Sequence, residues 1–345
     1  MDDRKALLVG SIPAPDTAAA VELALDTLGR QLIAIPDGET GDRKAWVAAI
    51  VDRLETNPAV RLTKVGHWSS YQDRPRYRVR PGRRLDPHAL DLGYHRAYLA
   101  SRPVVRAAAA RRDLDAPPFQ IGMASGFDLA LFSLGVTGAL RHRRPFNEAA
   151  AREIAQVRAD GGADVVFQIE LPAELVLVAR APALLRKAVA RWMGRMAVEI
   201  PRAAAPGTRF GMHLCYGDLG NRALVSGLAD CSATVSLTNA IVAHWPGTVA
   251  LDYVHVPFAA GEEPPPTSAE YYAPLAKLRL PSRTRLVAGF VHEAQSEEQQ
   301  RAVLGLIDAA AQRRVDIAAS CGLGRRHEPV ARSIMESSRL LCRTP

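Results

Sequence analysis

The chain has 345 residues, 48% of them hydrophobic, which is enough for a complete core in one large domain or two ordinary ones. No apolar stretch approaches the roughly 18 residues that a membrane span needs, and the start of the chain lacks the pattern of a secretory leader. The net charge of +8 comes from scattered arginines, and no nucleic-acid-binding module is recognisable. We therefore expect a cytoplasmic protein without membrane or nucleic-acid partners.

Short apolar runs typical of strands alternate along the chain with longer, alanine-rich stretches typical of helices. The strand-like runs cover 6–10, 31–36, 119–124, 165–169, 209–214, 249–254, 285–291 and 315–319. The helix-like stretches include 17–28, 147–159, 176–198, 297–313 and 329–341. This alternation favours a parallel sheet covered by helices, and eight such units in this length fit an α/β fold of the (β/α)8, or TIM-barrel, type. The sequence predicts a single barrel domain over residues 1–345.

The segment 54–118 interrupts this alternation. It shows no clear strand, it is too long for an ordinary connection, and six arginines fall between positions 74 and 84. We interpret it as an elaborated loop or small helical insertion after the second strand, lying over the active face. The arginines form either a clamp for an anionic substrate tail or an ordinary solvated loop.

Two cysteines and a histidine suggest a metal site. Side chains alternate along a strand, so His213 and Cys215, which are two residues apart, point the same way. Cys321 follows the last strand-like run, and the carboxyl ends of barrel strands share one face. Zinc prefers nitrogen and sulfur donors of this kind. The spacing predicts a zinc site, and the alternative is that these cysteines are small buried hydrophobes.

Other polar residues also follow strand-like runs, at the end of the strand where barrel enzymes place their catalytic groups. They are Ser11 after the first run, Glu39 after the second, Glu170 after the fourth, Asp252 and His255 at the sixth, and His292 and Glu293 after the seventh.

Five short motifs, in the same order along the chain, resemble those of the catalytic C-terminal barrel of cobalamin-independent methionine synthase. Gly10-Ser11-Ile12-Pro13 is similar to IGSFP, Gly38-Glu39 to a GE pair, Gln168-Ile169-Glu170-Leu171-Pro172-Ala173 to QIDEPA, His213-Leu214-Cys215-Tyr216 to HMCY, and Ser320-Cys321-Gly322-Leu323 to DCGL. Their joint occurrence is far more specific than any one of them. The resemblance implies a zinc-bearing (β/α)8 barrel that transfers an alkyl group to a thiol.

The resemblance also implies roles for individual residues. His213, Cys215 and Cys321 would bind zinc. Glu39 and Glu170 would hold the ammonium group of an amino acid substrate, and Ser11 would meet its carboxylate. Asp252 stands where the family has a fourth, glutamate ligand, with His255 as its rival. The family's proton-relay histidine aligns with Ala294, so His292 or Glu293 would supply the acid.

The resulting hypothesis is a methyltransferase that moves a methyl or other alkyl group to a zinc-activated thiol, with homocysteine as the expected acceptor. The donor stays open among methylfolate, a methylcorrinoid and other methyl donors, and the sequence does not predict an oligomeric state. Two alternatives remain. One is a metal-free lyase or decarboxylase on the related uroporphyrinogen decarboxylase-like barrel, and the other is a barrel that holds zinc without catalysis.

Overall fold

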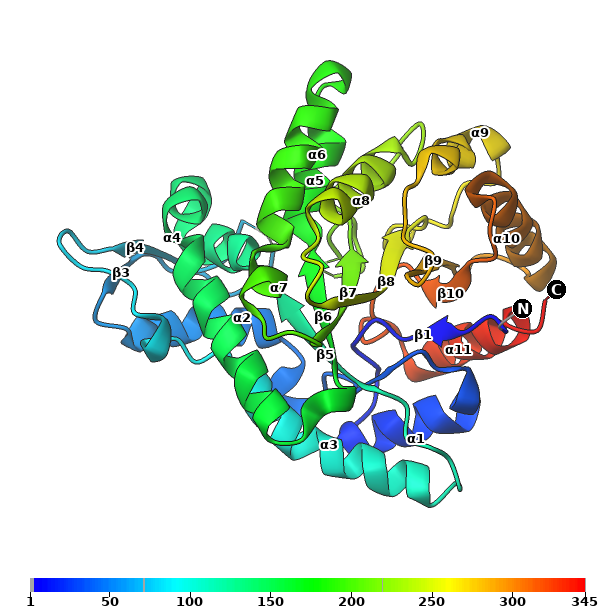
Figure 1. Cartoon of the computed structure of the whole chain (residues 1–345), viewed down its shortest axis with the longest axis horizontal. Helices are drawn as coiled ribbons and strands as arrows, with labels where there is room; N and C mark the ends of the chain where they lie inside the picture. The colour runs from blue at the N-terminus through cyan, green and yellow to red at the C-terminus, as the bar shows by residue number, and fades with distance from the viewer. Residues whose placement is uncertain (1–2, 71, 219, 345) are drawn as a thin grey trace.

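A computed structural model describes residues 3–70, 72–218 and 220–344 of the chain. Eight parallel strands form one sheet that curls into a barrel, with helices around it (Figure 1). The sheet order is β1, β10, β9, β8, β7, β6, β5, β2. The strands are β1 (Ala6–Leu7), β2 (Ile35–Pro36), β5 (Phe119–Ala124), β6 (Val166–Leu171), β7 (Arg209–Leu214), β8 (Ala250–Pro257), β9 (Arg285–Val291) and β10 (Asp316–Ala319).

The barrel closes between its first two strands. Ala6 of β1 forms an isolated parallel bridge with Leu32, and the Ile33 N–H donates to Ala6 O at 2.9 Å. Every strand-like run of the sequence overlaps one of these strands, so the prediction of a (β/α)8 barrel is confirmed.

Helices cover the outside of the barrel in most of the connections between successive strands. They are α1 (Thr17–Thr27), α2 (Trp46–Asp52), α3 (Tyr94–Ala110), α4 (Gly126–Ala159), α5 (Pro172–Arg180), α6 (Ala183–Ala197), α7 (Glu199–Ala203), α8 (Ser232–His244), α9 (Ala269–Tyr272), α10 (Glu297–Ala311) and α11 (Glu328–Leu341). The predicted helix at 176–198 is in fact split, because Pro182 ends α5 and starts α6. The helix α4 is longer than predicted and is broken at Gly135, whose φ of 74° suits glycine.

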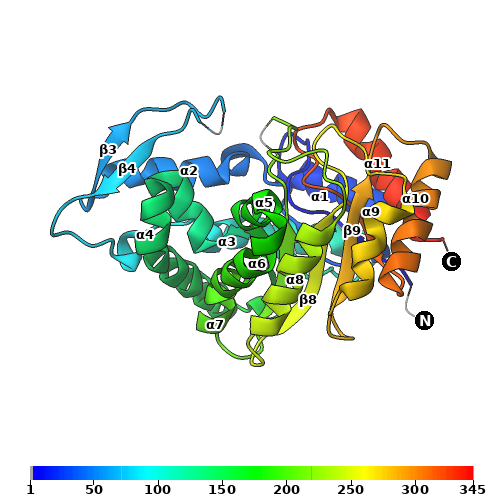
Figure 2. The same cartoon turned by 90° about the horizontal axis from the view of Figure 1, so that it is seen from above.

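The segment 54–118 contains regular structure that the sequence did not predict. The strands β3 (Val60–Lys64) and β4 (Arg76–Val79) pair as an antiparallel ribbon that projects from the side of the barrel (Figure 2). The expectation that this segment lacks a strand was therefore wrong. The helix α3 packs against α1 and β5, where an ordinary barrel helix belongs. The material added to a simple barrel is thus the part around α2 and the ribbon.

The inside of the barrel changes from apolar to polar toward the carboxyl ends of the strands. Leu7, Val166, Tyr253, Val287 and Ala318 form a small apolar cluster apart from the main core. The hydroxyl oxygen of Tyr253 then lies 3.1 Å from Gln120 Oε1 and 3.0 Å from Gln168 Oε1, the two acceptors for its one proton.

Gly211 makes room for the Tyr253 ring, because a methyl group on Gly211 would stand 2.1 Å from that ring. The polar residues of the candidate site lie beyond this layer. Among the described residues, no helix is both long and apolar enough to span a membrane.

Candidate metal centre and active site

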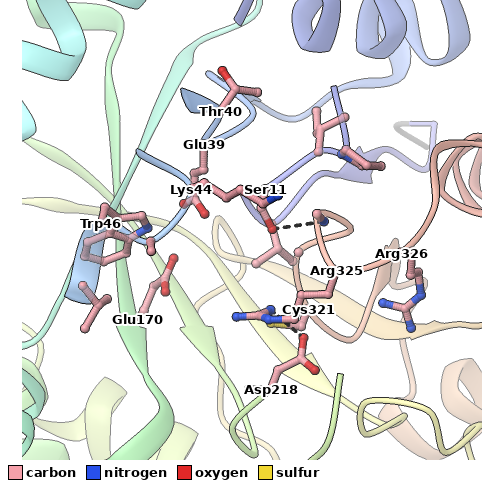
Figure 3. A pocket seen from close by; sticks show the side chains of 18 of the residues that line it. Ser11, Glu39, Thr40, Lys44, Trp46, Glu170, Asp218, Cys321, Arg325 and Arg326 are labelled. Carbon is pink, nitrogen blue, oxygen red and sulfur yellow. Dashed lines mark hydrogen bonds and ion pairs between the residues drawn. The ribbon is translucent and has the colours of Figure 1, made fainter. Parts of the chain in front are cut away.

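A cavity of about 640 Å³ opens at the carboxyl ends of the barrel strands (Figure 3). Its lining includes the aromatic rings of Trp46, Trp68 and Phe132. Its polar lining comes from segments far apart in the sequence and includes Ser11, Glu39, Lys44, Glu170, His213, Cys215, Asp218, Cys321, Arg325 and Arg326.

The three predicted zinc ligands lie together in this cavity. His213 is the fifth residue of β7, Cys215 directly follows that strand, and Cys321 lies two residues after β10. The two sulfur atoms are 3.8 Å apart, and Cys321 Sγ is 3.9 Å from His213 Nε2. One ligand atom from each residue lies within 4.8 Å of the others. The contact with Cys215, together with burial, raises the pKa of the Cys321 thiol, so this sulfur keeps its proton unless a cation binds.

The structure does not bring Asp252 to this cluster, contrary to its predicted role as fourth ligand. Its carboxylate Oδ2 accepts from Arg209 Nε at 2.8 Å. Arg209 is the first residue of β7, whereas Cys215 follows the end of that strand. Asp252 therefore lies toward the amino ends of the strands, away from the cavity, and its charge is used in an ion pair.

His255, the rival for that role, is close to the cluster but contacts its histidine. It pairs with His213 in the register of β7 and β8, and the two Nδ1 atoms are 2.9 Å apart. Both rings are buried. Burial lowers the pKa of His255 to about 4 and that of His213 well below its ordinary value, so both rings are neutral near pH 7.

Glu39 and Glu170 bring two carboxylates into the same cavity, and Glu170 pairs with His213 in the register of β6 and β7. A methyl group on Gly122 of β5 would stand 2.9 Å from Glu170 Oε1 and 3.1 Å from Glu39 Oε1, so only a glycine leaves room for both. Burial raises the pKa of Glu39 to about 7, against the attraction of Arg43. Burial and the charge of Glu39 raise the pKa of Glu170 to about 8. This pair favours a positively charged partner.

Ser11 joins the first and last segments of the chain at the cavity wall. Its Oγ accepts from Gly324 N at 3.2 Å, the dashed line at Ser11 in Figure 3. Its carbonyl accepts from Leu323 N at 2.7 Å. Because Leu323 and Gly324 closely follow Cys321, these bonds hold the cysteine-bearing loop against the loop after β1.

Sequence reasoning missed an ion pair beside the cluster. Arg325 Nη1 lies 2.9 Å from Asp218 Oδ2 and 4.0 Å from Cys321 Sγ. Asp218 and Arg325 lie 107 positions apart, and no local pattern links them. The one signal in the sequence was proximity to the cysteines, because Asp218 follows Cys215 by three residues and Arg325 follows Cys321 by four.

His292 and Glu293, the predicted proton donors, do not line the cavity. The two ring nitrogens of His292 lie 3.2 Å from Gly261 O and 3.1 Å from Ala294 N. Glu293 accepts from Arg326 Nε at 2.8 Å. The structure therefore places both residues in a network that fixes Arg326 and the loop around Gly261.

No protein-family model matches the sequence, and no curated protein matches it. Solved structures do match. A B12-independent methionine synthase from Shewanella sp. W3-18-1, in complex with selenomethionine, gives a TM-score of 0.64 at 12% identity over 99% of this chain and 97% of its own. A candidate vitamin B12-independent methionine synthase from Listeria monocytogenes gives 0.58 at 13% identity over 97% and 95%.

A methyltransferase from Methanosarcina mazei gives a TM-score of 0.50 at 12% identity over 98% of this chain and 94% of its own. At these identities the likeness is one of fold. Along almost its whole length, the chain has the fold of cobalamin-independent methionine synthase structures, as the sequence motifs led us to expect.

Proposed function

We propose that this protein is a zinc-dependent methyltransferase, of the cobalamin-independent methionine synthase type, that moves a methyl or other alkyl group to a thiol. Homocysteine is the proposed acceptor. One observation carries the proposal: a His, Cys, Cys cluster and a pair of half-buried carboxylates line one cavity. The fold shared with methionine synthase structures supports the same function.

The donor set of the cluster fits zinc. Two sulfur ligands at the usual zinc–sulfur distance and tetrahedral angle stand about 3.8 Å apart. The Sγ atoms of Cys215 and Cys321 are 3.8 Å apart. With His213 as the third ligand, a coordination position is left for a substrate sulfur. Zinc held there would supply the Lewis acidity that makes a thiol ionise near neutral pH.

The carboxylate pair suits an acceptor that carries an ammonium group. The carboxylates of Glu39 and Glu170 lie close together and raise each other's energy when ionised, and a cation bound between them would relieve this repulsion. The Ser11 hydroxyl accepts from Gly324 N and keeps its own proton to donate to a substrate carboxylate. An amino acid thiol held by these three residues would have its sulfur directed to the cluster. Such positioning accounts for much of the rate of a transfer reaction.

The methyl donor would occupy the part of the cavity next to the three aromatic rings. Trp46, Trp68 and Phe132 offer flat apolar surface there. The proposal does not specify the donor, which can be a methylfolate, a methylcorrinoid or another methyl compound. Neither His292 nor Glu293 takes part as an acid in this proposal, because neither lines the cavity.

The experiment that tests the proposal joins a zinc assay to a thiol-methylation assay on the full-length protein. Homocysteine is offered with methylfolate, methylcobalamin and simple sulfonium donors in turn. We expect about one zinc per chain and methylation with one of the donors. Both are expected to be lost in Cys215→Ser and Cys321→Ser. The matched control is Cys342→Ser, which changes a buried cysteine outside the cluster.

Two outcomes would contradict the proposal in different ways. A metal-free protein that is active as a lyase would favour the decarboxylase-like alternative. Zinc that depends on Cys215 and Cys321, without methylation of any thiol, would favour a zinc-holding barrel. In the second case, an unchanged zinc content of Cys342→Ser shows that the substitutions at Cys215 and Cys321 acted locally.

A further inference from the structure

His255 contacts both chain segments that carry the proposed zinc ligands. On one side its Nδ1 lies 2.9 Å from Nδ1 of His213. On the other side its Nε2 lies 2.9 Å from the carbonyl oxygen of Ala319, the last residue of β10 and two residues before Cys321. A single buried imidazole therefore connects the strand of one ligand with the strand that leads to another.

The partners of His255 determine where the protons lie. A carbonyl oxygen only accepts, so the Nε2 of His255 carries a proton and donates it to Ala319 O. In a neutral ring the other nitrogen is then bare, so Nδ1 of His255 accepts from Nδ1–H of His213. This leaves His213 Nε2 without a proton. That nitrogen is the one 3.9 Å from Cys321 Sγ.

The barrel wall is shaped to hold the His255 ring in this position. A methyl group on Gly289 of β9 would stand 2.5 Å from His255 Nε2 and 2.7 Å from its Cε1. Any larger residue at position 289 would displace the ring from Ala319. The ladder between β9 and β10 also shifts register between Ala318 and Ala319, next to the carbonyl that accepts the bond.

We propose that His255 is a positioning residue that holds His213 as the Nδ1–H tautomer and so presents the Nε2 lone pair to the metal. This inference rests on the proposed zinc site and gives His255 a role other than that of a fourth ligand. A metal-bound histidine usually donates its second N–H to a fixed acceptor, which orients the ring and raises its basicity. Here the acceptor is another imidazole, itself fixed by a backbone carbonyl.

The first test reads the tautomers directly in the metal-free, full-length protein. Long-range proton–nitrogen NMR on protein labelled with ¹⁵N-histidine distinguishes a protonated Nδ1 from a protonated Nε2. We expect His213 to be protonated at Nδ1 and His255 at Nε2, with the two signals assigned from the His213→Ala and His255→Asn variants. A His213 protonated at Nε2 would overturn the inference, whatever the zinc content or activity.

The second test measures zinc affinity by competition with a chromophoric chelator. His255→Phe removes both hydrogen bonds and is expected to weaken zinc binding roughly 10- to 100-fold. His255→Asn keeps an oxygen that can accept from His213 and is expected to recover most of that loss. The matched control is His244→Phe, a half-buried histidine at the end of α8, with unchanged affinity expected.

Two further results would contradict the inference. One is a His255→Phe variant that keeps both the zinc affinity and the His213 tautomer of the unmodified protein. The other is an X-ray absorption spectrum of the zinc-loaded protein that requires two imidazole ligands, which would make His255 a ligand. If His255→Phe does not fold, the tautomers of the unmodified protein and the His255→Asn affinity decide. Zinc bound with the expected tautomers but without thiol methylation would contradict the proposed function alone.

Discussion

The carboxylate of Glu39 lies beside that of Glu170, and the backbone of Glu39 has a φ of +50°. This left-handed conformation is uncommon for a residue with a side chain, and such strain concentrates at functional sites. The Glu39 N–H donates to Asp37 Oδ1 at 3.0 Å, which fixes the turn after β2. The loop thus holds a strained residue next to a like charge, an arrangement that a bound cationic group would stabilise.

The carboxylate pair predicts how acceptor binding depends on pH. The pKa of Glu39 is raised to about 7 and that of Glu170 to about 8, so both are ionised only above about pH 8. We expect the KM of an amino acid thiol to rise as the pH falls from about 8 to 6, where its ammonium group stays protonated, with a smaller change in kcat. Steady-state kinetics across that range checks this. A KM that does not change with pH would contradict the ammonium-binding role.

Glu170→Gln should weaken acceptor binding and, at alkaline pH, stabilise the fold. Loss of a charged hydrogen bond is worth roughly 1.5–3 kcal/mol, or about a 10- to 100-fold rise in KM. Because folding raises the pKa of Glu170, the folded state loses stability as the pH rises from about 4.5 to 8. Glutamine does not titrate, so the variant should lose less stability than the unmodified protein over that range.

Thermal unfolding at pH 5 and pH 9 measures this difference for Glu170→Gln. Glu262→Gln, which changes an exposed carboxylate, is the matched control and should follow the unmodified protein. Equal losses of stability in Glu170→Gln and the unmodified protein would show that the Glu170 charge is not strained in the fold.

Asp252→Asn should leave the zinc content unchanged. The carboxylate is bound by Arg209 toward the amino ends of the strands, so the substitution removes an ion pair and no ligand. Both side chains are partly exposed, so the expected loss of unfolding free energy is about 1 kcal/mol or less. Metal analysis and chemical denaturation check the two parts. Loss of zinc in the correctly folded variant would restore Asp252 as a ligand.

Glu293→Gln should affect stability more than chemistry. Its Oε1 accepts from Arg326 Nε, and Arg326 Nη2 in turn donates to Gly261 O at 3.2 Å. We expect a lower Tm, a turnover rate within about tenfold of the unmodified enzyme and an unchanged shape of the pH–rate profile. If turnover instead slows by about two orders of magnitude and the acid-dependent part of that profile disappears, Glu293 is a proton donor.

Gly211→Ala tests the packing of the barrel interior. The added methyl group would stand 2.1 Å from the Tyr253 ring, which is held by Gln120 and Gln168. Overpacking of this kind typically costs about 1–3 kcal/mol or more. Gly305→Ala in α10, where nothing lies within 4 Å, is the control and should stabilise by roughly 0.5–1 kcal/mol. Denaturant unfolding of both variants gives the comparison, and a neutral Gly211→Ala would show that the ring can move.

The strands of the barrel could be predicted because each is buried on both faces and is therefore an apolar run between polar turns. The ribbon of β3 and β4 escaped prediction because most of its side chains are exposed and four of its nine are charged, with Arg61 opposite Arg78. Apolar patterning marks strands that face a core, and this ribbon has only a few such positions. Val60 and Tyr77 are the buried ones.

The convergence of His213, Cys215 and Cys321 was predictable. All three lie at or just after the carboxyl ends of strand-like runs, and these ends share one face of a barrel. The placement of Asp252 was not. It lies where β8 has one more residue than β7, and the register shift between Phe210 and Gly211 changes which side chains face the cavity. Such a bulge leaves no mark in the pattern of residue types. The partners of His292 and Glu293 could not be predicted either, because Gly261 and Arg326 contact them from loops that are distant in the sequence.

The two halves of the site stand on parts of the barrel with unequal backbone support. Ser11 and Glu39 follow β1 and β2, which have two residues each, and β1 meets the segment before β2 through one isolated bridge, between Ala6 and Leu32. His213 lies in a six-residue strand paired on both sides. Amide hydrogens at the joint between β1 and β2 should therefore exchange with solvent sooner than those of β7. The Ser11 and Glu39 loops can therefore adjust to ligands of different shape, while Glu170 and the sulfur and nitrogen donors keep their spacing.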